Sequence, residues 1–498
     1  MTDLNADVVV VGAGNAACCA ALSAREQGVS VIVLERAPES LRGGNTAYTA
    51  GAMRVAFGGS SDIEQLVPDL SAQEKATTDF GRYPKDQFLD DLARVTDYKC
   101  DPDLAEILVE NSFPTLQWMR QKGVRFAPIY GRQAFKQDGL FKFWGGLVIE
   151  AVGGGLGLIA ALYSALEQSG IDVFYEADVN TVERDDNGIS ALHARIGGKQ
   201  TVIHAGAVVL ACGGFQANPQ WRTRYLGPGW ETAKVRGTPF NTGDGIRIAT
   251  EIGAATRGNW SGCHAVAWER NAPEFGDLAV GDGFQKHSYP FGIMINANGD
   301  RFVDEGADFR NYTYAKYGRE VLAQPGQFAW QIFDQKVAHL LRDEYRIKQV
   351  TKVSADSLEG LSIKLDDVDA ERFRSTVAEY NQAVDDDIPF DPNVLDGRST
   401  RGLVLSKSNW ANRLDEPPYE AYAVTCGITF TFGGLRINTA GQVMGTDLSP
   451  INGLFAAGEI VGGLFYFNYP GGSGLTNGAV FGRIAGREAG LFAKGSKI

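Results

Sequence analysis

The segment from Val8 to Glu35 constrains the fold more than any other part of the chain. An apolar run at Val8–Val11 leads into a glycine turn, then into a helix of small residues expected at about Asn15–Gln27, and then into a second apolar run at Val29–Leu34. Two apolar runs of strand length joined by a turn and a helix indicate a βαβ unit, whose strands lie parallel in one sheet. The chain is therefore predicted to begin with an α/β domain.

The turn of this unit, GAGNAA, has the spacing of a dinucleotide-binding turn. Gly12 permits the tight bend, Gly14 lets backbone amides approach a pyrophosphate, and Ala17 lets the helix pack closely on the strand. Glu35 ends the second strand, where an acid accepts the hydroxyls of an adenosine ribose. The alternative is an ordinary turn of small residues. The full context favours a Rossmann-like dinucleotide-binding domain.

Further glycine turns follow at Gly43-Gly44, Gly213-Gly214, Gly243-Asp244-Gly245 and Gly471–Gly474. Several of them end apolar runs or begin helices, where backbone can approach a ligand closely. A single large ligand contacted from several distant segments explains them together.

The character of the sequence changes between Asn259 and Thr429, where glycine turns become rarer and charged residues more frequent. Amphipathic helical patterns appear at Asp334–Tyr345 and Asp369–Val384. We interpret this part as an inserted α+β domain. The predicted division is residues 1–258 and 430–498 for the dinucleotide-binding domain and residues 259–429 for the inserted capping domain.

Composition excludes several classes of partner and site. The net charge of −13 argues against general attraction to nucleic acid or acidic membranes, and the apolar runs are too short for membrane insertion. The six cysteines show neither C-x-x-C spacing nor a disulfide framework, which indicates a reducing compartment, and we expect a cytoplasmic protein. The histidines lack partners at metal-ligand spacing, so no metal site is predicted.

Taken in order, these motifs resemble the fumarate reductase/succinate dehydrogenase flavoprotein superfamily. Within it, the segments Asp304–Arg319 and Phe465–Arg483 are most similar to tricarballylate dehydrogenases. The resemblance implies an FAD domain, a mobile capping domain and a substrate held between them against the flavin ring. NTAYTAG, which follows the second glycine cluster, lacks the histidine that carries covalent flavin in respiratory succinate dehydrogenases, so FAD is expected to bind noncovalently.

The motifs and the resemblance together give the candidate cofactor-binding residues. They are Gly12, Gly14, Asn15, Ala16, Glu35, Arg36, Gly43, Gly44, Asn45, Thr46, Gly51, Ala211, Gly213, Gly214, Asp244, Gly458, Glu459, Gly472, Ser473, Gly474 and Leu475.

Arg310 is the first candidate for proton transfer, because the resemblance places the catalytic arginine of fumarate reductases in this block with a shift of one residue. A structural ion pair with Asp308 or Glu305 is the alternative. Tyr312 and Tyr314 are neighbouring candidates for the same role.

Tyr469 stands where fumarate reductases have a carboxylate-binding arginine and where ketosteroid dehydrogenases have a tyrosine. Its phenol is predicted to donate a hydrogen bond to a substrate carbonyl or carboxylate. The resemblance also gives His264 and Thr431 as substrate-contacting candidates. The glutamate and arginine of the family's proton relay are missing from GFQKHSYPFG, which leaves Gln285, Lys286, His287 or Ser288 in that region.

The leading hypothesis is an FAD-dependent dehydrogenase that desaturates a C–C bond next to a carboxylate or carbonyl, with a small polycarboxylate of the tricarballylate to cis-aconitate type as the expected substrate. The alternatives are a desaturase of a cyclic ketone, an ene-reductase that runs in reverse, and a non-catalytic flavoprotein subunit. Electrons must pass to a separate acceptor, which is a partner protein, a quinone or oxygen.

Overall fold

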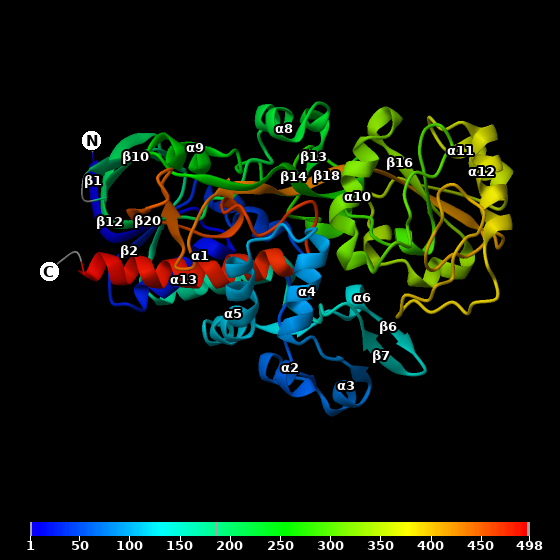
Figure 1. Ribbon diagram of the computed structural model, residues 1–498, viewed down its shortest axis with the longest axis horizontal. Helices are drawn as coiled ribbons and strands as arrows, with labels where there is room; N and C mark the ends of the chain where they lie inside the picture. The colour runs from blue at the N-terminus through cyan, green and yellow to red at the C-terminus, as the bar shows by residue number, and fades with distance from the viewer. Residues whose placement is uncertain (1, 186–187, 496–498) are drawn as a thin grey trace.

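The computed structural model describes residues 2–185 and 188–495, and it places two large sheets next to each other along the long axis of the molecule (Figure 1). In the first, eight-stranded sheet, β1 pairs in parallel with β2 on one side and with β12 on the other. The predicted βαβ unit and the α/β fold class are thus confirmed. The strands of this sheet are β1 (Thr2–Val11), β2 (Val31–Leu34), β9 (Asp172–Phe174), β10 (Ala177–Asp185), β11 (Gly188–Ile196), β12 (Lys199–Leu210), β19 (Gln442–Met444) and β20 (Pro450–Ala456).

Two helices, α1 (Asn15–Arg25) and α13 (Ser473–Gly495), lie against each other on one face of this sheet (Figure 1). Glycines permit their close approach, because a Cβ at Gly482 would lie 2.4 Å from the carbonyl oxygen of Ala16, and one at Gly486 would lie 2.0 Å from that of Ala20. This packing brings the N-terminus of the last helix to the glycine turn that follows β1.

The second sheet has the order β13-β18-β16-β15, and both β14 and β17 also pair with β18. Its two long strands, β14 and β18, cross both predicted domain boundaries without a break, so the exact division of the chain stays a prediction. The strands are β13 (Lys234–Val235), β14 (Thr256–Glu269), β15 (Ile293–Ile295), β16 (Ala329–Phe333), β17 (Lys352–Ala355) and β18 (Tyr419–Leu435).

Two small sheets complete the fold, and β6 and β7 of one of them extend at the lower side of the molecule in Figure 1. Their strands are β3 (Ala52–Met53), β5 (Phe126–Pro128) and β8 (Ile149–Ala151) in one, and β4 (Thr78–Asp79), β6 (Ala134–Gln137) and β7 (Leu140–Phe143) in the other. The remaining α-helices are α2 (Ser60–Leu66), α3 (Ala72–Ala76), α4 (Lys85–Val95), α5 (Pro102–Gln121), α6 (Tyr130–Gln133), α7 (Gly154–Gln168), α8 (Pro219–Leu226), α9 (Asp244–Glu251), α10 (Tyr314–Leu322), α11 (Leu358–Lys364) and α12 (Ala370–Ala383).

The helical pattern predicted at Asp334–Tyr345 forms two short 3-10 helices, Gln335–Leu340 and Asp343–Tyr345. Leu341 and Arg342 between them are extended, with ψ values of 133° and 168°. This break turns the Arg342 side chain into the interior, where the residue is 5% exposed.

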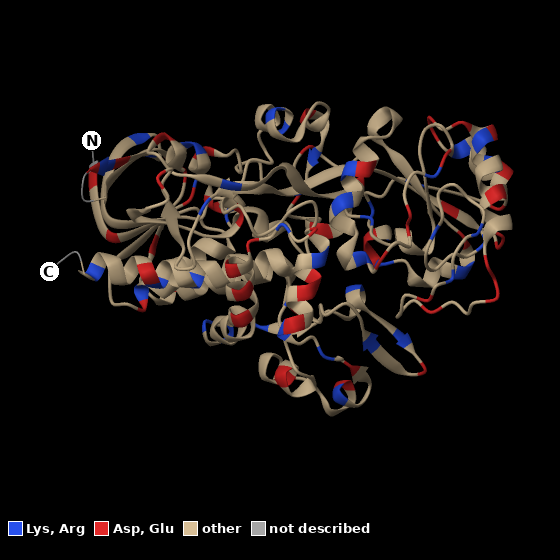
Figure 2. Cartoon of the chain, in the orientation of Figure 1, with Lys and Arg blue, Asp and Glu red and all other residues tan. Residues whose placement is uncertain are grey.

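Charged residues of both signs are intermingled along the molecule (Figure 2). Within residues 2–185 and 188–495, no helix combines the length and the apolar character needed to cross a membrane.

Candidate active site

One large cavity, of about 260 Å³, runs between the two large sheets and is lined by segments that lie far apart in the sequence. Its walls include the turn after β1, the end of β2, the second glycine cluster, the end of β12, and the turn before α13. The glycine turns singled out in the sequence therefore do meet around one space.

At one end of the cavity, the first turn has the geometry that a bound dinucleotide needs. Gly12 has φ +100°, and a Cβ there would lie 2.5 Å from the carbonyl oxygen of Ala211. Gly14 precedes the N-terminus of α1, whose free amides favour a negatively charged group. Glu35 is 6% exposed, and burial raises the pKa of its carboxyl group. The chemistry of this end fits the pyrophosphate and ribose of FAD.

Arg36 and Asp244 face each other at the rim of this end. Arg36 Nη1 lies 2.8 Å from Asp244 Oδ2 and donates to the Thr242 hydroxyl at 2.6 Å. Asp244 begins α9, and this pair ties that helix to the end of β2.

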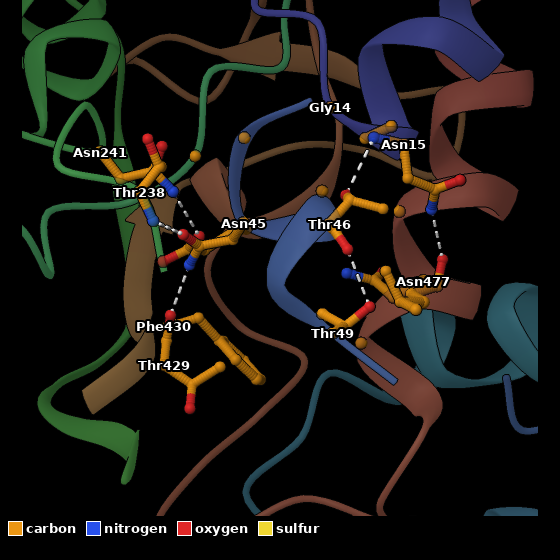
Figure 3. Close-up of a pocket in the computed structure, with 18 of the residues that line it drawn as sticks. Gly14, Asn15, Asn45, Thr46, Thr49, Thr238, Asn241, Thr429, Phe430 and Asn477 are labelled. Atoms are coloured by element: carbon orange, nitrogen blue, oxygen red, sulfur yellow. Dashed lines mark hydrogen bonds between the residues drawn. The ribbon is translucent and has the colours of Figure 1, made fainter. Parts of the chain in front are cut away.

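The second glycine cluster lies next to the first turn, where Gly43 precedes a short helix over Gly44–Tyr48 (Figure 3). The backbone amide of Asn15 donates to the Thr46 hydroxyl at 3.1 Å, which joins the two turns. Asn45 lines the cavity, but its amide group donates to the carbonyl of Thr429 at 2.6 Å and accepts from the backbone of Thr238 at 3.0 Å. Asn45 therefore connects the cofactor side of the cavity to the second sheet.

Glu459 lies in the cavity wall opposite this cluster. Its carboxylate accepts from the Thr431 amide at 3.0 Å and from the side chains of Gln216 and Asn241 at 3.2 and 3.3 Å. Burial raises the pKa of Glu459 to about 7. Gly214 makes room for this network, because a Cβ there would lie 2.4 Å from Glu459.

Most of the predicted cofactor-binding residues line the cavity. They are Gly12, Gly14, Asn15, Ala16, Glu35, Arg36, Gly44, Asn45, Thr46, Ala211, Gly213, Asp244, Gly458, Glu459, Gly472, Gly474 and Leu475. Gly43, Gly51, Gly214 and Ser473 lie just behind the wall: Gly43 packs on Ile159, Gly51 on Gly154, and the Ser473 hydroxyl donates to the Pro470 carbonyl.

Four of the predicted catalytic residues, Arg310, Tyr314, Thr431 and Tyr469, line the other end of the cavity. The hydroxyls of Tyr314 and Tyr469 are hydrogen-bonded to each other. The Thr431 hydroxyl accepts from the Phe215 amide at 3.4 Å.

The structure places Tyr312 and His264 outside the cavity. The Tyr312 hydroxyl donates to Asp91 at 2.6 Å and receives a hydrogen bond from Arg54 at 3.3 Å. His264 packs edge-on against Tyr314 and Tyr469, each with 4.9 Å between ring centroids. Burial lowers the pKa of His264 well below its ordinary value, so the imidazole is neutral behind the tyrosine pair.

Sequence reasoning missed a cluster of charges at this end, formed by Arg132, Arg236 and Asp282. Asp282 accepts from Arg236 Nε and from Arg132 Nη1, both at 2.8 Å. Arg132 lies in α6 and Arg236 directly follows β13, and neither belongs to a recognisable motif. A glycine next to Arg236 could have pointed to this part of the site. This residue is Gly237, and in the structure a Cβ there would lie 2.1 Å from the Asn45 side chain.

Arg310 differs from these two arginines because it forms no ion pair within the described residues. Its Nη2 donates to the Arg132 carbonyl at 2.5 Å, and its Nη1 lies 3.3 Å from His287 Nδ1. Its Nε is buried and has no hydrogen-bond partner in the described part of the chain. Burial lowers the pKa of the guanidinium. Three arginines thus face this end of the cavity. Asp282 pairs with two of them, and the buried Glu344 carboxylate acts through space on Arg310 and Arg132.

Comparisons with known proteins agree with this geometry. The sequence matches the FAD binding domain family over residues 7–475. It is 31% identical over 490 residues to a probable fumarate reductase, Ifc3, of Shewanella frigidimarina, covering 97% of this chain and 74% of the relative. It is 26% identical to a 3-oxosteroid 1-dehydrogenase of Mycolicibacterium smegmatis, covering 100% of this chain and 99% of that protein. The open conformation of a flavocytochrome c3 fumarate reductase has a TM-score of 0.73 at 26% identity, covering 98% of this chain and 79% of that structure.

Proposed function

Because the chain belongs to the FAD binding domain family and is an FAD-dependent oxidoreductase acting on CH–CH groups, we propose that it desaturates a small polycarboxylate of the tricarballylate to cis-aconitate type. The electrons then pass to a separate acceptor, which is a partner protein, a quinone or oxygen. The cavity residues at the dinucleotide end would hold FAD, which would supply the hydride acceptor.

The observation that supports this substrate class is the excess of positive charge at the closed end of the cavity. Buried charges are tolerated when opposite charges pair with them. Asp282 pairs with Arg132 and Arg236, whereas the buried Glu344 acts on Arg310 only through space, and among the described residues no carboxylate lies within ion-pair distance of Arg310. A substrate that carries several carboxylates supplies the missing negative charge.

The residues of the chain transfer the proton, orient the substrate and exclude water. Arg310 exchanges the proton at the carbon next to the one that loses hydride, since it lines this end of the cavity and burial lowers the pKa of its guanidinium. Arg132 and Arg236 orient the carboxylates through fixed, planar donors. Tyr314 and Tyr469 contribute hydroxyls, while Phe430 and Phe465 line the cavity and exclude water.

One observation favours a second candidate, the desaturation of a cyclic ketone. The hydrogen-bonded hydroxyls of Tyr314 and Tyr469 are suited to polarise a neutral carbonyl, and a 3-oxosteroid 1-dehydrogenase is similar along its whole length. The arginine cluster weighs against this candidate, because a neutral ring leaves these charges without a counter-charge.

Replacing Arg236 with glutamine tests the polycarboxylate assignment. We expect the Kd of the holoenzyme for citrate, followed by the change in the flavin spectrum, to rise about 10- to 100-fold, because a hydrogen bond to a charged group contributes about 1.5–3 kcal/mol. Arg346→Gln is the control, since Arg346 is paired with Asp343 at the surface. An unchanged Kd in Arg236→Gln, or a wild-type enzyme that binds a neutral ring ketone but not citrate, would contradict the assignment.

A further inference from the structure

A second, small cavity lies directly behind the charged end of the large one. His287 and Arg310 line both cavities. Aromatic rings form much of its wall: Trp144 stacks on Phe309 with 5.0 Å between ring centroids, and Trp410 packs against Phe309 at 5.8 Å. Its volume of about 10 Å³ accommodates roughly one water molecule.

Four residues that line this small cavity each have a buried polar atom without a hydrogen-bond partner in the described part of the chain. Buried polar groups in proteins are almost always paired with protein or with ordered water. The concentration of unpaired atoms around one water-sized space indicates that the space is wet. The atoms are Arg310 Nε, His287 Nε2, Arg342 Nη2 and Trp144 Nε1.

The contact between Arg310 and His287 fixes where the imidazole carries its proton. Arg310 Nη1 lies 3.3 Å from His287 Nδ1. A guanidinium can donate but not accept, so Nδ1 accepts and the ring proton sits on Nε2. The proton-bearing nitrogen is therefore the one that has no protein partner. Burial and the nearby charges of Arg310, Arg236 and Arg132 lower the pKa of His287 well below its ordinary value. The neutral His264 also acts on it, and the Tyr314 ring packs edge-on against the imidazole with 4.8 Å between centroids.

We propose that His287 relays protons between Arg310 and a water molecule in the small cavity. Arg310 Nη1–H first passes a proton to His287 Nδ1, while His287 Nε2 releases its own proton to the water. The neutral guanidine that remains then takes the proton from the substrate, so Arg310 regains its single positive charge, the imidazole stays neutral and one proton has moved outwards. The reverse movement supplies a proton for reduction.

One side of the small cavity lies near a surface loop. Pro392, which forms part of its wall, is half-buried, and the following residues Val394 and Leu395 are 47% and 48% exposed. The relay thus leads from the closed end of the substrate site towards a surface loop of the second sheet's domain.

The inference rests on the proposed function, and substitutions of His287 test it. His287→Asn keeps an acceptor towards Arg310 but cannot pass a proton on. In the FAD-loaded enzyme we expect flavin reduction at saturating substrate to slow about a hundredfold or more, with the substrate Kd little changed and with a changed solvent deuterium isotope effect. His339→Asn is the control, because His339 is exposed.

A second variant, His287→Ala, distinguishes a relay from a structural role. Added imidazoles should restore its rate in proportion to their basicity, which a role in packing alone does not explain. A wild-type rate and isotope effect in His287→Asn, or a slow and FAD-loaded His287→Ala that imidazoles do not restore, would overturn the relay. Both variants are tested with the acid or ketone that reduces the flavin of the wild-type enzyme. The wild-type enzyme therefore tests the polycarboxylate assignment, and the variants test the relay.

Discussion

Replacing Arg310 with glutamine is expected to slow substrate-driven flavin reduction by about a hundredfold to ten-thousandfold, while FAD stays bound. Arg310 lines the substrate end of the cavity, and burial lowers the pKa of its guanidinium. Glutamine retains a polar group of similar reach but cannot exchange a proton in this way. The measurement is the rate of flavin bleaching after anaerobic mixing with substrate, together with the FAD content of the purified variant.

Arg319→Gln is the matched control for this variant. Arg319 lies in the same stretch of sequence but donates to the Ser261 carbonyl and packs over Trp230, away from the cavity. We expect it to react like the wild type. An Arg310→Gln enzyme that retains FAD and is reduced at a near-normal rate would remove Arg310 from proton transfer.

Gly12→Ala is expected to yield protein without bound FAD. The left-handed φ of +100° alone costs an alanine about 1–3 kcal/mol. In addition, the new Cβ would lie 2.5 Å from the Ala211 carbonyl oxygen and 2.8 Å from the Cys212 Cα. The turn after β1 must then move away from the end of β12, which displaces both walls of the dinucleotide end of the cavity.

Gly28→Ala separates crowding from backbone strain. Gly28 also has a left-handed φ, of +80°, but a Cβ there meets no atom within 4 Å. This variant should lose some stability and keep its FAD, so the ratio of flavin absorbance to protein absorbance should fall in Gly12→Ala alone. Full FAD content in a folded Gly12→Ala protein would contradict the assignment of this turn to the dinucleotide.

The cofactor side of the site was predictable because local sequence determines it. The GAGNAA turn, Glu35 and the glycine pairs require special backbone geometry or end a strand, and the structure brings most of them to one cavity. Gly43 and Gly51 were also predicted to bind the cofactor, but they pack closely against Ile159 and Gly154 behind the cavity wall. Sequence alone does not distinguish a glycine that faces a ligand from one that faces another element.

The substrate side was harder to predict because its residues come together through tertiary contacts. Arg132, Arg236 and Asp282 lie on three separate segments and meet through hydrogen bonds across more than forty residues of sequence. Conversely, Tyr312 and Tyr314 are two residues apart, and only Tyr314 faces the cavity, because the 3-10 turn at Arg310–Tyr312 directs Tyr312 to Asp91.

The most direct test of the proposed function is anaerobic bleaching of the flavin absorbance of the purified protein by a panel of tricarballylate, succinate, citrate and a cyclic ketone. The arginine cluster predicts bleaching by a polycarboxylate and none by the ketone. Bleaching by the cyclic ketone alone would contradict the polycarboxylate assignment and favour the tyrosine pair as the group that binds substrate. If no compound bleaches the flavin but fumarate or cis-aconitate reoxidises the dithionite-reduced protein, the enzyme is a reductase and the proposed direction is wrong.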